Sequence, residues 1–206
     1  MADTDRPQLY LVTPATFDPQ PFTERLAPIL DTVEVACLRI ALATRNEDDL
    51  GRAADALRAL AHERDVAVVI DSHPKLAERH GLDGVHLLDA ARSIREARRQ
   101  LGPDAIVGAF CGASRHDGMT AGEAGADYVS FGPVGDTLLG TRPRAEFDLF
   151  EWWSQMIEVP VVAEGALTPE LVERFAPVTD FVAIGDEIWR APDPLSALRA
   201  LLAPIG

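Results

Sequence analysis

Short, continuous runs of apolar residues alternate along the chain with longer stretches in which apolar residues recur at helical spacing. Continuous apolar runs of strand length are typical of parallel strands that are covered on both faces. The runs predict eight strands, over residues 9–13, 33–40, 66–70, 84–88, 105–110, 128–131, 159–163 and 181–184. The helical spacing predicts helices over residues 22–30, 47–62, 74–80, 93–101, 120–124, 147–157 and 194–202, and one more that begins near Thr168.

Local signals at the ends of the predicted helices support these boundaries. Asn46 is a candidate N-cap for the second helix, and Gly81 can end the third. Gly125 can close the helix before the sixth strand in the left-handed conformation. Thr168-Pro169-Glu170 places a cap, a proline and an acid where the next helix should start. The pattern therefore predicts a regular succession of strands and helices.

An aspartate leads into a short apolar strand three times, at Asp83, Asp127 and Asp180. This recurrence suggests a repeated βα unit. Eight strands alternating with about eight helices fit a single-domain (β/α)₈ TIM barrel over residues 1–206, near the short end of the range for that fold. A doubly wound open sheet is the alternative.

Composition narrows the classes of function. The chain has 206 residues, of which 47% are hydrophobic, and this is enough for one substantial core. Its formal net charge of −14 argues against nucleic acid or an anionic membrane as a partner. No apolar run approaches membrane-spanning length, and the polar N-terminus is unlike a signal peptide. Cys37 and Cys111 are too few for a disulfide scaffold, so the expected location is a reducing cytoplasm.

The basic residues constrain the chemistry, because Lys75 is the only lysine and the rest are arginines. A Schiff-base mechanism would therefore have to use Lys75. We place this residue near the start of a helix rather than at the end of a strand, which disfavours such a mechanism.

The histidines, cysteines and tryptophans give weaker indications. His86 lies inside the predicted fourth strand and is expected to be a packed, hydrogen-bonded core residue, whereas His73 at a strand end is better placed for solvent access. No base is evident beside Cys37 or Cys111, so both are expected to be small buried side chains rather than nucleophiles. In the pair Trp152-Trp153 only one ring can face the barrel, and the other either marks a partner surface or is merely a partly exposed aromatic. The sequence leaves a homo-oligomer open.

In a barrel, the C-terminal ends of the strands and the loops after them carry the function. Gly165 and Gly185 follow the seventh and eighth strands, where barrels often bind phosphate, although each glycine can equally serve only a tight turn. Asp71, Asp89 and Glu164 also stand at strand ends. Converging carboxylates suit Mg²⁺ and a diphosphate, and the alternative is that they cap N–H groups of the loops. The other residues at these ends are Thr13, Arg39, Ser72, His73, Cys111, Thr137, Arg142, Arg144, Asp186 and Glu187.

Several motifs occur in the order seen in thiamine phosphate synthases. They are Leu9-Tyr10-Leu11-Val12-Thr13, Leu38-Arg39, Asp83-Gly84-Val85-His86-Leu87, Gly125-Ala126-Asp127-Tyr128, Gly132-Pro133-Val134 and Pro160-Val161-Val162-Ala163. The chain resembles this family from Leu9 to about Ile188. The resemblance implies a (β/α)₈ enzyme that uses Mg²⁺ to join a hydroxymethylpyrimidine diphosphate to a thiazole phosphate. Such an enzyme forms thiamine phosphate and releases diphosphate, so small phosphorylated molecules are the expected partners.

The resemblance also implies roles for individual residues, and here the chain departs from the family pattern. Arg39 is retained as a ligand of the diphosphate. Asp71 replaces an asparagine, and the metal-binding aspartate that follows it in the family is Ser72 here. Asp89 stands two positions before the usual place of the second metal aspartate. Asp71 and Asp89 are thus the implied Mg²⁺ ligands.

On the phosphate side, Thr137 is retained, and Arg142 or Arg144 stands in for a lysine of the family, because a guanidinium binds phosphate in a bidentate fork. The implied catalytic residues are Arg39, Arg142 and Arg144, and the implied substrate-binding residues are Thr13, His73, Thr137, Gly165 and Gly185. Glu164, Asp186 and Glu187 would face the thiazole phosphate in the family pose. Like charges a few ångströms apart repel strongly, which weighs against unaltered catalysis.

Two other functions stay open. The missing lysines and metal aspartates fit a catalytically silent relative that binds a thiamine-related ligand or serves as an interaction scaffold. A tautomerase-like protein acting on the thiazole phosphate would need a catalytic histidine where Pro133 stands, which disfavours this option.

Overall fold

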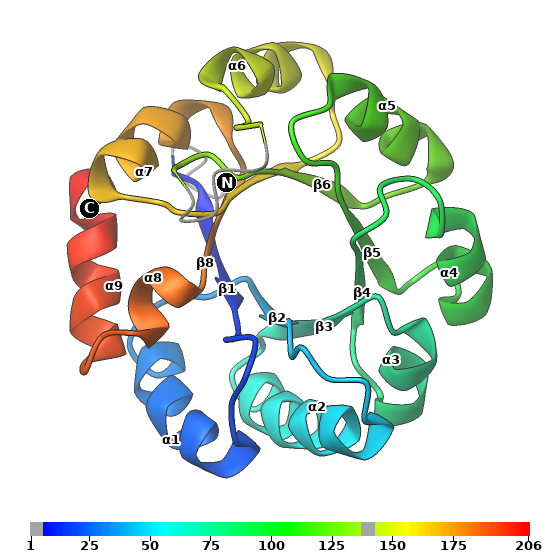
Figure 1. Cartoon of the computed structure of the whole chain (residues 1–206), viewed down its shortest axis with the longest axis vertical. Coiled ribbons are helices and arrows are strands. Elements are labelled where there is room, and N and C mark those ends of the chain that lie inside the picture. Colours follow the sequence, from blue (N-terminus) through cyan, green and yellow to red (C-terminus); the bar gives the residue numbers. More distant parts are fainter. Residues whose placement is uncertain (1–5, 137–142) are drawn as a thin grey trace.

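Eight parallel strands close into a ring, with the helices around its outside, in the computed structural model of the chain (Figure 1). The structure describes residues 6–136 and 143–206. The strands follow one another in chain order, and the last pairs with the first, with Val182 opposite Leu9. The predicted (β/α)₈ barrel is therefore confirmed and the open-sheet alternative is excluded.

The strands are β1 (Gln8–Val12), β2 (Cys37–Ile40), β3 (Ala67–Asp71), β4 (Gly84–Leu87), β5 (Ile106–Phe110), β6 (Tyr128–Phe131), β7 (Val161–Glu164) and β8 (Phe181–Ile184). The α-helices are α1 (Pro19–Leu30), α2 (Glu47–His62), α3 (Pro74–His80), α4 (Ile94–Leu101), α5 (Arg115–Ala124), α6 (Phe147–Met156), α7 (Pro169–Phe175), α8 (Asp186–Trp189) and α9 (Pro194–Leu202). Two 3₁₀ helices, η1 (Ala176–Val178) and η2 (Ala203–Ile205), follow α7 and α9. Within the described ranges, no helix has both the length and the apolar character needed to cross a membrane.

Most predicted boundaries lie within two residues of the observed ones, but α1 begins at Pro19, three residues before its predicted start, and β2 and α5 differ by more. Strand β2 begins at Cys37 rather than at residue 33, because the chain first completes the end of α1, where the Val33 N–H donates to the Ile29 carbonyl at 2.8 Å. Helix α5 begins at Arg115, where the Ser114 hydroxyl caps it, five residues before the predicted segment. The short helix α8 was not predicted as a separate element.

The predicted helix ends are present. The Asn46 side chain accepts the N–H of Asp48 at the start of α2, and the Thr168 side chain caps α7. Gly81 and Gly125 end α3 and α5 in the left-handed conformation, with φ of 62° and 99°. Here a glycine is favoured because a Cβ atom would strain this backbone conformation.

The aspartates that lead into β4, β6 and β8 all make one contact. Each accepts a hydrogen bond from a backbone N–H near the start of the preceding strand. The pairs are Val68 with Asp83, Val107 with Asp127 and Val161 with Asp180, at 2.7, 2.7 and 2.8 Å. Before β2 the equivalent place is held by Ala36, whose N–H donates to the Leu9 carbonyl at 2.9 Å but whose side chain offers no acceptor. The repeat suggested by the sequence is thus a pair of neighbouring strands joined through an aspartate. It occurs in the pairs β3–β4, β5–β6 and β7–β8, and the pair β1–β2 lacks the aspartate.

The strands bury side chains on both faces, as their continuous apolar runs predicted. Outward-facing residues and the inner faces of the helices form the larger core. The inward-facing residues form a narrow column through the barrel, made of Tyr10, Cys37, Val69, Tyr128, Val162 and Ala183. Because successive side chains of a strand alternate in direction, the residues two positions further along these strands also point inward, at the C-terminal mouth. They include Arg39, Asp71 and Glu164.

The tryptophan and cysteine predictions are confirmed. Trp153 is buried in the core, whereas Trp152 is only partly buried and has the Arg115 guanidinium 4.1 Å from its ring centre. Cys37 and Cys111 are free and buried, and burial raises the pKa of each thiol to about 12. Burial therefore favours the neutral thiol of each cysteine near neutral pH, in line with the expected buried side chains.

Candidate functional site

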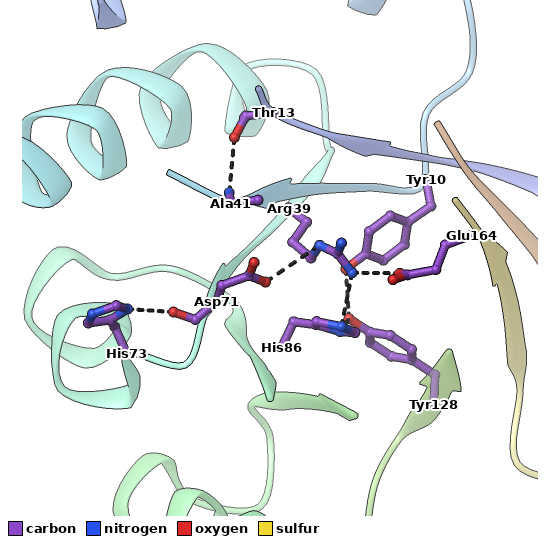
Figure 2. A network of polar contacts seen from close by, with 9 residues as sticks. All are labelled: Tyr10, Thr13, Arg39, Ala41, Asp71, His73, His86, Tyr128 and Glu164. Atoms are coloured by element: carbon purple, nitrogen blue, oxygen red, sulfur yellow. Dashed lines mark hydrogen bonds and ion pairs between the residues drawn. The ribbon is translucent and has the colours of Figure 1, made fainter. Parts of the chain in front are cut away.

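Arg39 lies at the centre of a buried ionic cluster at the C-terminal mouth of the barrel (Figure 2). Its Nη1 donates to Glu164 Oε2 at 2.8 Å, and its Nε lies 3.5 Å from Asp71 Oδ1. Asp71 ends β3 and Glu164 ends β7, so side chains from the neighbouring strands β2 and β3 meet one from the distant strand β7 at this guanidinium. The predicted proximity of Arg39 and Asp71 is present in the structure.

The two carboxylates are not equivalent partners of Arg39. Burial opposes the charge of the guanidinium, but Glu164 and then Asp71 outweigh it and raise the pKa of Arg39 above its ordinary value. For Asp71, burial is the largest influence and raises the pKa to about 6, against the attraction of Arg39. Asp71 Oδ1 and Arg39 Nε are both buried without a hydrogen-bond partner among the described residues. Glu164 is therefore the main counter-ion of Arg39, whereas burial favours the protonated form of Asp71.

A chain of hydrogen bonds runs from Arg39 down the barrel axis (Figure 2). Arg39 Nη1 lies 2.9 Å from His86 Nε2, and His86 Nδ1 lies 2.9 Å from the Tyr128 hydroxyl. The Tyr128 and Tyr10 hydroxyl groups are 2.7 Å apart. Because a guanidinium can only donate, we assign Nε2 of His86 as the acceptor and place its proton on Nδ1, which donates to Tyr128. Burial and then Arg39 lower the pKa of His86, which agrees with a neutral ring.

This chain ends at a small cavity near the N-terminal end of the barrel. The cavity has a volume of about 210 Å³, and Tyr10, Tyr128 and Cys37 contribute to its lining. His86 is fully buried, so the expectation of a packed, hydrogen-bonded core histidine is confirmed. Its neighbours show, however, that it also holds the guanidinium at the mouth.

The loops after β7 and β8 are joined by the Glu187 carboxylate. Its Oε2 accepts the N–H of Gly185 at 2.8 Å, and its Oε1 accepts the N–H of Leu167 at 3.2 Å. Gly165 has φ of +89°, and a Cβ there would lie 3.0 Å from the Cα of Pro133. Gly165 thus serves a tight turn, while the Gly185 N–H is one of two backbone donors gathered on a carboxylate.

The structure places Thr13 and His73 beside the cluster, where both make backbone contacts. The Thr13 hydroxyl accepts the N–H of Ala41 at 2.9 Å and so ties the ends of β1 and β2 together. His73 Nδ1 contacts the carbonyl oxygen of Asp71, which fixes the imidazole at the start of α3 (Figure 2). Both remain candidates for substrate contact, with positions set by the backbone.

Asp89 does not join the cluster. It is exposed, and its Oδ2 accepts the Ser93 hydroxyl at 2.6 Å in the loop before α4. Among residues 6–136 and 143–206, no group of three or more histidine, cysteine, aspartate or glutamate side chains is placed to hold a metal ion. The residues therefore fit a complete protein cage for Mg²⁺ poorly. They do fit the looser mode in which one carboxylate, here Asp71, and substrate phosphates share the ion.

The segment after β6 is only partly described. Thr137 and Arg142 lie outside the described residues. Arg144 is exposed, with Nη1 2.9 Å from Asp136 Oδ1 and Nε 3.5 Å from Glu146 Oε1. Its guanidinium is thus paired with two carboxylates, as that of Arg39 is.

Sequence reasoning gave no role to several residues that make up this site. Tyr10, His86 and Tyr128 were assigned to strands and not to the site, and Glu187 was treated only as a repelling charge. The signal that could have identified them is the two-residue alternation of the strands, which puts Tyr10, His86 and Tyr128 on the same inward face as Arg39. The direction in which the Glu187 side chain turns has no such signature.

Comparison with known proteins shows which family the chain belongs to. The family model described as thiamine monophosphate synthase matches residues 9–188. The chain is 45% identical over 192 residues to the thiamine-phosphate synthase of Rhodospirillum centenum, with 90% of each chain covered. It is 39% identical over 215 residues to that of Erythrobacter litoralis, with 100% of this chain and 99% of the relative covered.

Solved structures show the same fold at lower sequence identity. A thiamine phosphate pyrophosphorylase from Pyrococcus furiosus superposes with a TM-score of 0.80 at 20% identity, covering 98% of this chain and 99% of that one. A 3-hexulose-6-phosphate synthase from Salmonella typhimurium gives a TM-score of 0.70 at 17% identity, covering 95% and 98%. Together with the two close sequence relatives, the match over nearly the whole barrel shows that the chain belongs to the thiamine monophosphate synthase family.

Proposed function

We propose that this protein condenses a hydroxymethylpyrimidine diphosphate with a thiazole phosphate to give thiamine phosphate and diphosphate. In this reaction the bond between the pyrimidine's methylene carbon and the diphosphate oxygen breaks, and its electron pair leaves with the diphosphate. The thiazole nitrogen then forms a bond to the same carbon. The protein has to stabilise the leaving diphosphate and hold the two rings in line, which is a task of positioning and electrostatics.

The observation that carries the proposal is the buried guanidinium of Arg39 at the barrel mouth. Its Nε is buried 3.5 Å from Asp71 Oδ1 and makes no hydrogen bond among the described residues, so this donor can serve a phosphate oxygen once the Asp71 side chain moves aside. The neighbouring His86 and Glu164 hold the rest of the group in position, at 2.9 and 2.8 Å from Nη1. A guanidinium that is fixed before the substrate arrives stabilises developing charge without reorganising during the reaction.

Further groups support the same assignment. We propose Arg142 or Arg144 as the second arginine on the diphosphate, and Thr13, His73, Thr137, Gly165 and Gly185 as substrate contacts. The Ser130 hydroxyl on β6 is buried without a partner among the described atoms, which makes it an additional candidate. Mg²⁺ would supply charge neutralisation of the diphosphate when bound, with Asp71 as its ligand. Asp89 would join only after releasing Ser93.

The test is an assay of the purified protein with both substrates and Mg²⁺, in which thiamine phosphate is quantified by chromatography after oxidation to its fluorescent derivative. We expect product only when both substrates are present. Arg39→Lys keeps a cation beside Glu164 but loses the planar fork, so we expect kcat/KM for the diphosphate substrate to fall about 100-fold.

The matched control is Arg52→Lys, because Arg52 is an exposed arginine of α2 that pairs with Asp49. It should leave the kinetic constants within about twofold of the wild type. Absence of thiamine phosphate above background with the wild-type protein would overturn the proposal.

A second function is favoured by one specific observation. Carboxylates already occupy the groups suited to anions, with Glu164 and Asp71 at Arg39 and Glu187 at the two backbone N–H groups. This arrangement fits a silent relative that binds a thiamine-related ligand without turnover. Calorimetric titration bears on this choice, since tight binding of the pyrimidine diphosphate only with Mg²⁺ favours the enzyme. Binding of a thiamine-related ligand by a protein that forms no product in the assay would identify the silent relative.

A further inference from the structure

The Glu187 carboxylate spans two loops with both of its oxygens. One oxygen is 2.8 Å from the N–H of Gly185 after β8, and the other is 3.2 Å from the N–H of Leu167 after β7. Charge-assisted hydrogen bonds of this kind are stronger than those between neutral groups. A negatively charged group of the protein itself therefore holds one backbone donor from each of the loops that follow β7 and β8.

The neighbouring acid shows that this contact is specific to Glu187. Asp186 carries the same charge on the same short helix, but its Oδ2 pairs with Arg190 at 2.6 Å, and its side chain is largely exposed. The two acids thus carry the same formal charge, but Asp186 contacts an arginine whereas Glu187 contacts two backbone N–H groups. This difference supplies a control within the chain.

We propose that Glu187 is a specificity-determining residue that competes with the phosphate of the thiazole substrate for the backbone donors of Gly185 and Leu167. This inference rests on the proposed function, because it concerns the second substrate of that reaction. A phosphate that approaches the two N–H groups has to displace the tethered carboxylate and then remains close to a like charge. The corresponding thiazole alcohol meets no such repulsion, and its hydroxyl can donate a hydrogen bond to the carboxylate. Glu187 therefore lowers the preference of the protein for the phosphorylated thiazole over the alcohol.

A purely structural role of Glu187 gives the opposite expectation. If the carboxylate only ties the two loops together, its removal loosens the mouth and weakens the binding of both thiazole compounds. If it competes with phosphate, its removal strengthens the binding of the phosphate alone. The ratio of the two affinities separates these cases, because loosening of the loops affects both compounds in the same direction.

The experiment is isothermal titration calorimetry of the thiazole phosphate and of the thiazole alcohol, without the pyrimidine substrate. The proteins are the wild type, Glu187→Gln, Glu187→Ala and the control Asp186→Asn. We expect the ratio of phosphate to alcohol affinity to rise at least tenfold in both Glu187 variants. Asp186→Asn removes the same charge from the same helix and should change the ratio by less than about threefold, as expected for an exposed charge that is screened.

A ratio in Glu187→Gln that does not exceed that of Asp186→Asn would overturn the inference, and so would the absence of binding of either compound to all four proteins. Thermal melting of each variant checks that it is folded, and the isosteric Glu187→Gln serves if Glu187→Ala is not. The proposed function fails by a different measurement, namely the absence of thiamine phosphate when wild-type protein has both substrates. The affinity ratios therefore test the role of Glu187, and product formation tests the proposed reaction. Either one can fail while the other holds.

Discussion

Arg39 is a cation whose charge is already shared before any substrate arrives. Glu164 takes one of its N–H groups, His86 accepts another, and Asp71 lies near its Nε without a hydrogen bond. A buried ion pair that loses one partner is strongly destabilised, so this arrangement fixes the guanidinium more firmly than a surface pair would. At the scale of the residue, the site is a guanidinium that is held in position by His86 and Glu164 and whose charge is already balanced by carboxylates. An incoming diphosphate therefore has to compete with carboxylates.

The pKa of Asp71 gives a prediction for stability. Burial raises the pKa of this carboxyl to about 6, above the value of about 3.9 expected in the unfolded chain. At a pH between these two pKa values the folded state binds more protons than the unfolded state, so the free energy of unfolding falls as the pH rises. Above pH of about 6 the ionised Asp71 lowers the stability by its full amount. Asp71→Asn removes this dependence. Its stability relative to the wild type should therefore increase by roughly 2 kcal/mol from pH of about 4 to about 7.

Urea denaturation across this pH range, with a chelator present to exclude metal, measures the effect of Asp71→Asn. Asp89→Asn is the matched control, because it removes an exposed carboxylate from the next strand end. A stability difference between Asp71→Asn and wild type that stays constant with pH would show that the buried carboxyl keeps an ordinary pKa.

The site could be predicted from the sequence only as far as strand ends define it. Arg39 and Asp71 were identified because both end parallel strands and so had to meet at one mouth. Glu164 was identified as a strand-end acid, but its pairing with Arg39 depends on the path of the side chain across the barrel. The contact of Glu187 with the loop after β7 depends on the conformation of two loops, which hydrophobic periodicity does not encode.

At the scale of the element, the recurring aspartates stabilise the starts of the odd-numbered strands. Asp180 is the best one to test, because Asp83 and Asp127 also pair with His62 and Arg98. Asp180→Ala leaves the Val161 N–H without its acceptor, which lies 2.8 Å away in the native protein. An unsatisfied backbone donor costs about 1–3 kcal/mol, so we expect the free energy of unfolding to fall by about that amount.

Asp180→Asn is the control in this case, because the amide oxygen can still accept the Val161 N–H. It should retain most of the stability that Asp180→Ala loses, as measured by urea denaturation. Equal stabilities of the two variants would mean that the hydrogen bond contributes little and that the aspartate serves another purpose at this turn.

Element order was predictable because burial on both faces makes each parallel strand a continuous apolar run, and eight such runs were recognised. The boundaries of the elements were less predictable where local hydrogen bonds, rather than the hydrophobic pattern, decide where a strand or helix begins. Val33 is apolar and β-branched, yet it belongs to the turn after α1, since its N–H is taken by Ile29. Helix α5 was predicted too short because Arg115 to Met119 carries few apolar residues, whereas the Ser114 cap fixes its start.

At the scale of the whole molecule, the acidic charge should set the response to salt. A formal net charge of −14 and a sequence pI of about 4.7 mean that the folded barrel repels itself at neutral pH. Raising the salt concentration from about 20 mM to about 300 mM shortens the Debye length from about 20 Å to about 6 Å and screens this repulsion. We expect Tm at pH of about 8 to rise by about 2–4 °C, which corresponds to about 1 kcal/mol for a chain of this size.

The same change of salt near the pI provides the control for the salt response. There the net charge is close to zero, so the long-range repulsion is absent and only the screening of individual ion pairs remains. Tm should then stay constant or fall slightly, as attractive pairs such as Arg64 with Asp31 are weakened. Calorimetric melts at both pH values separate the two contributions. A fall of Tm with salt at pH of about 8 would show that the attraction within ion pairs stabilises the folded protein more than the repulsion from its net charge destabilises it.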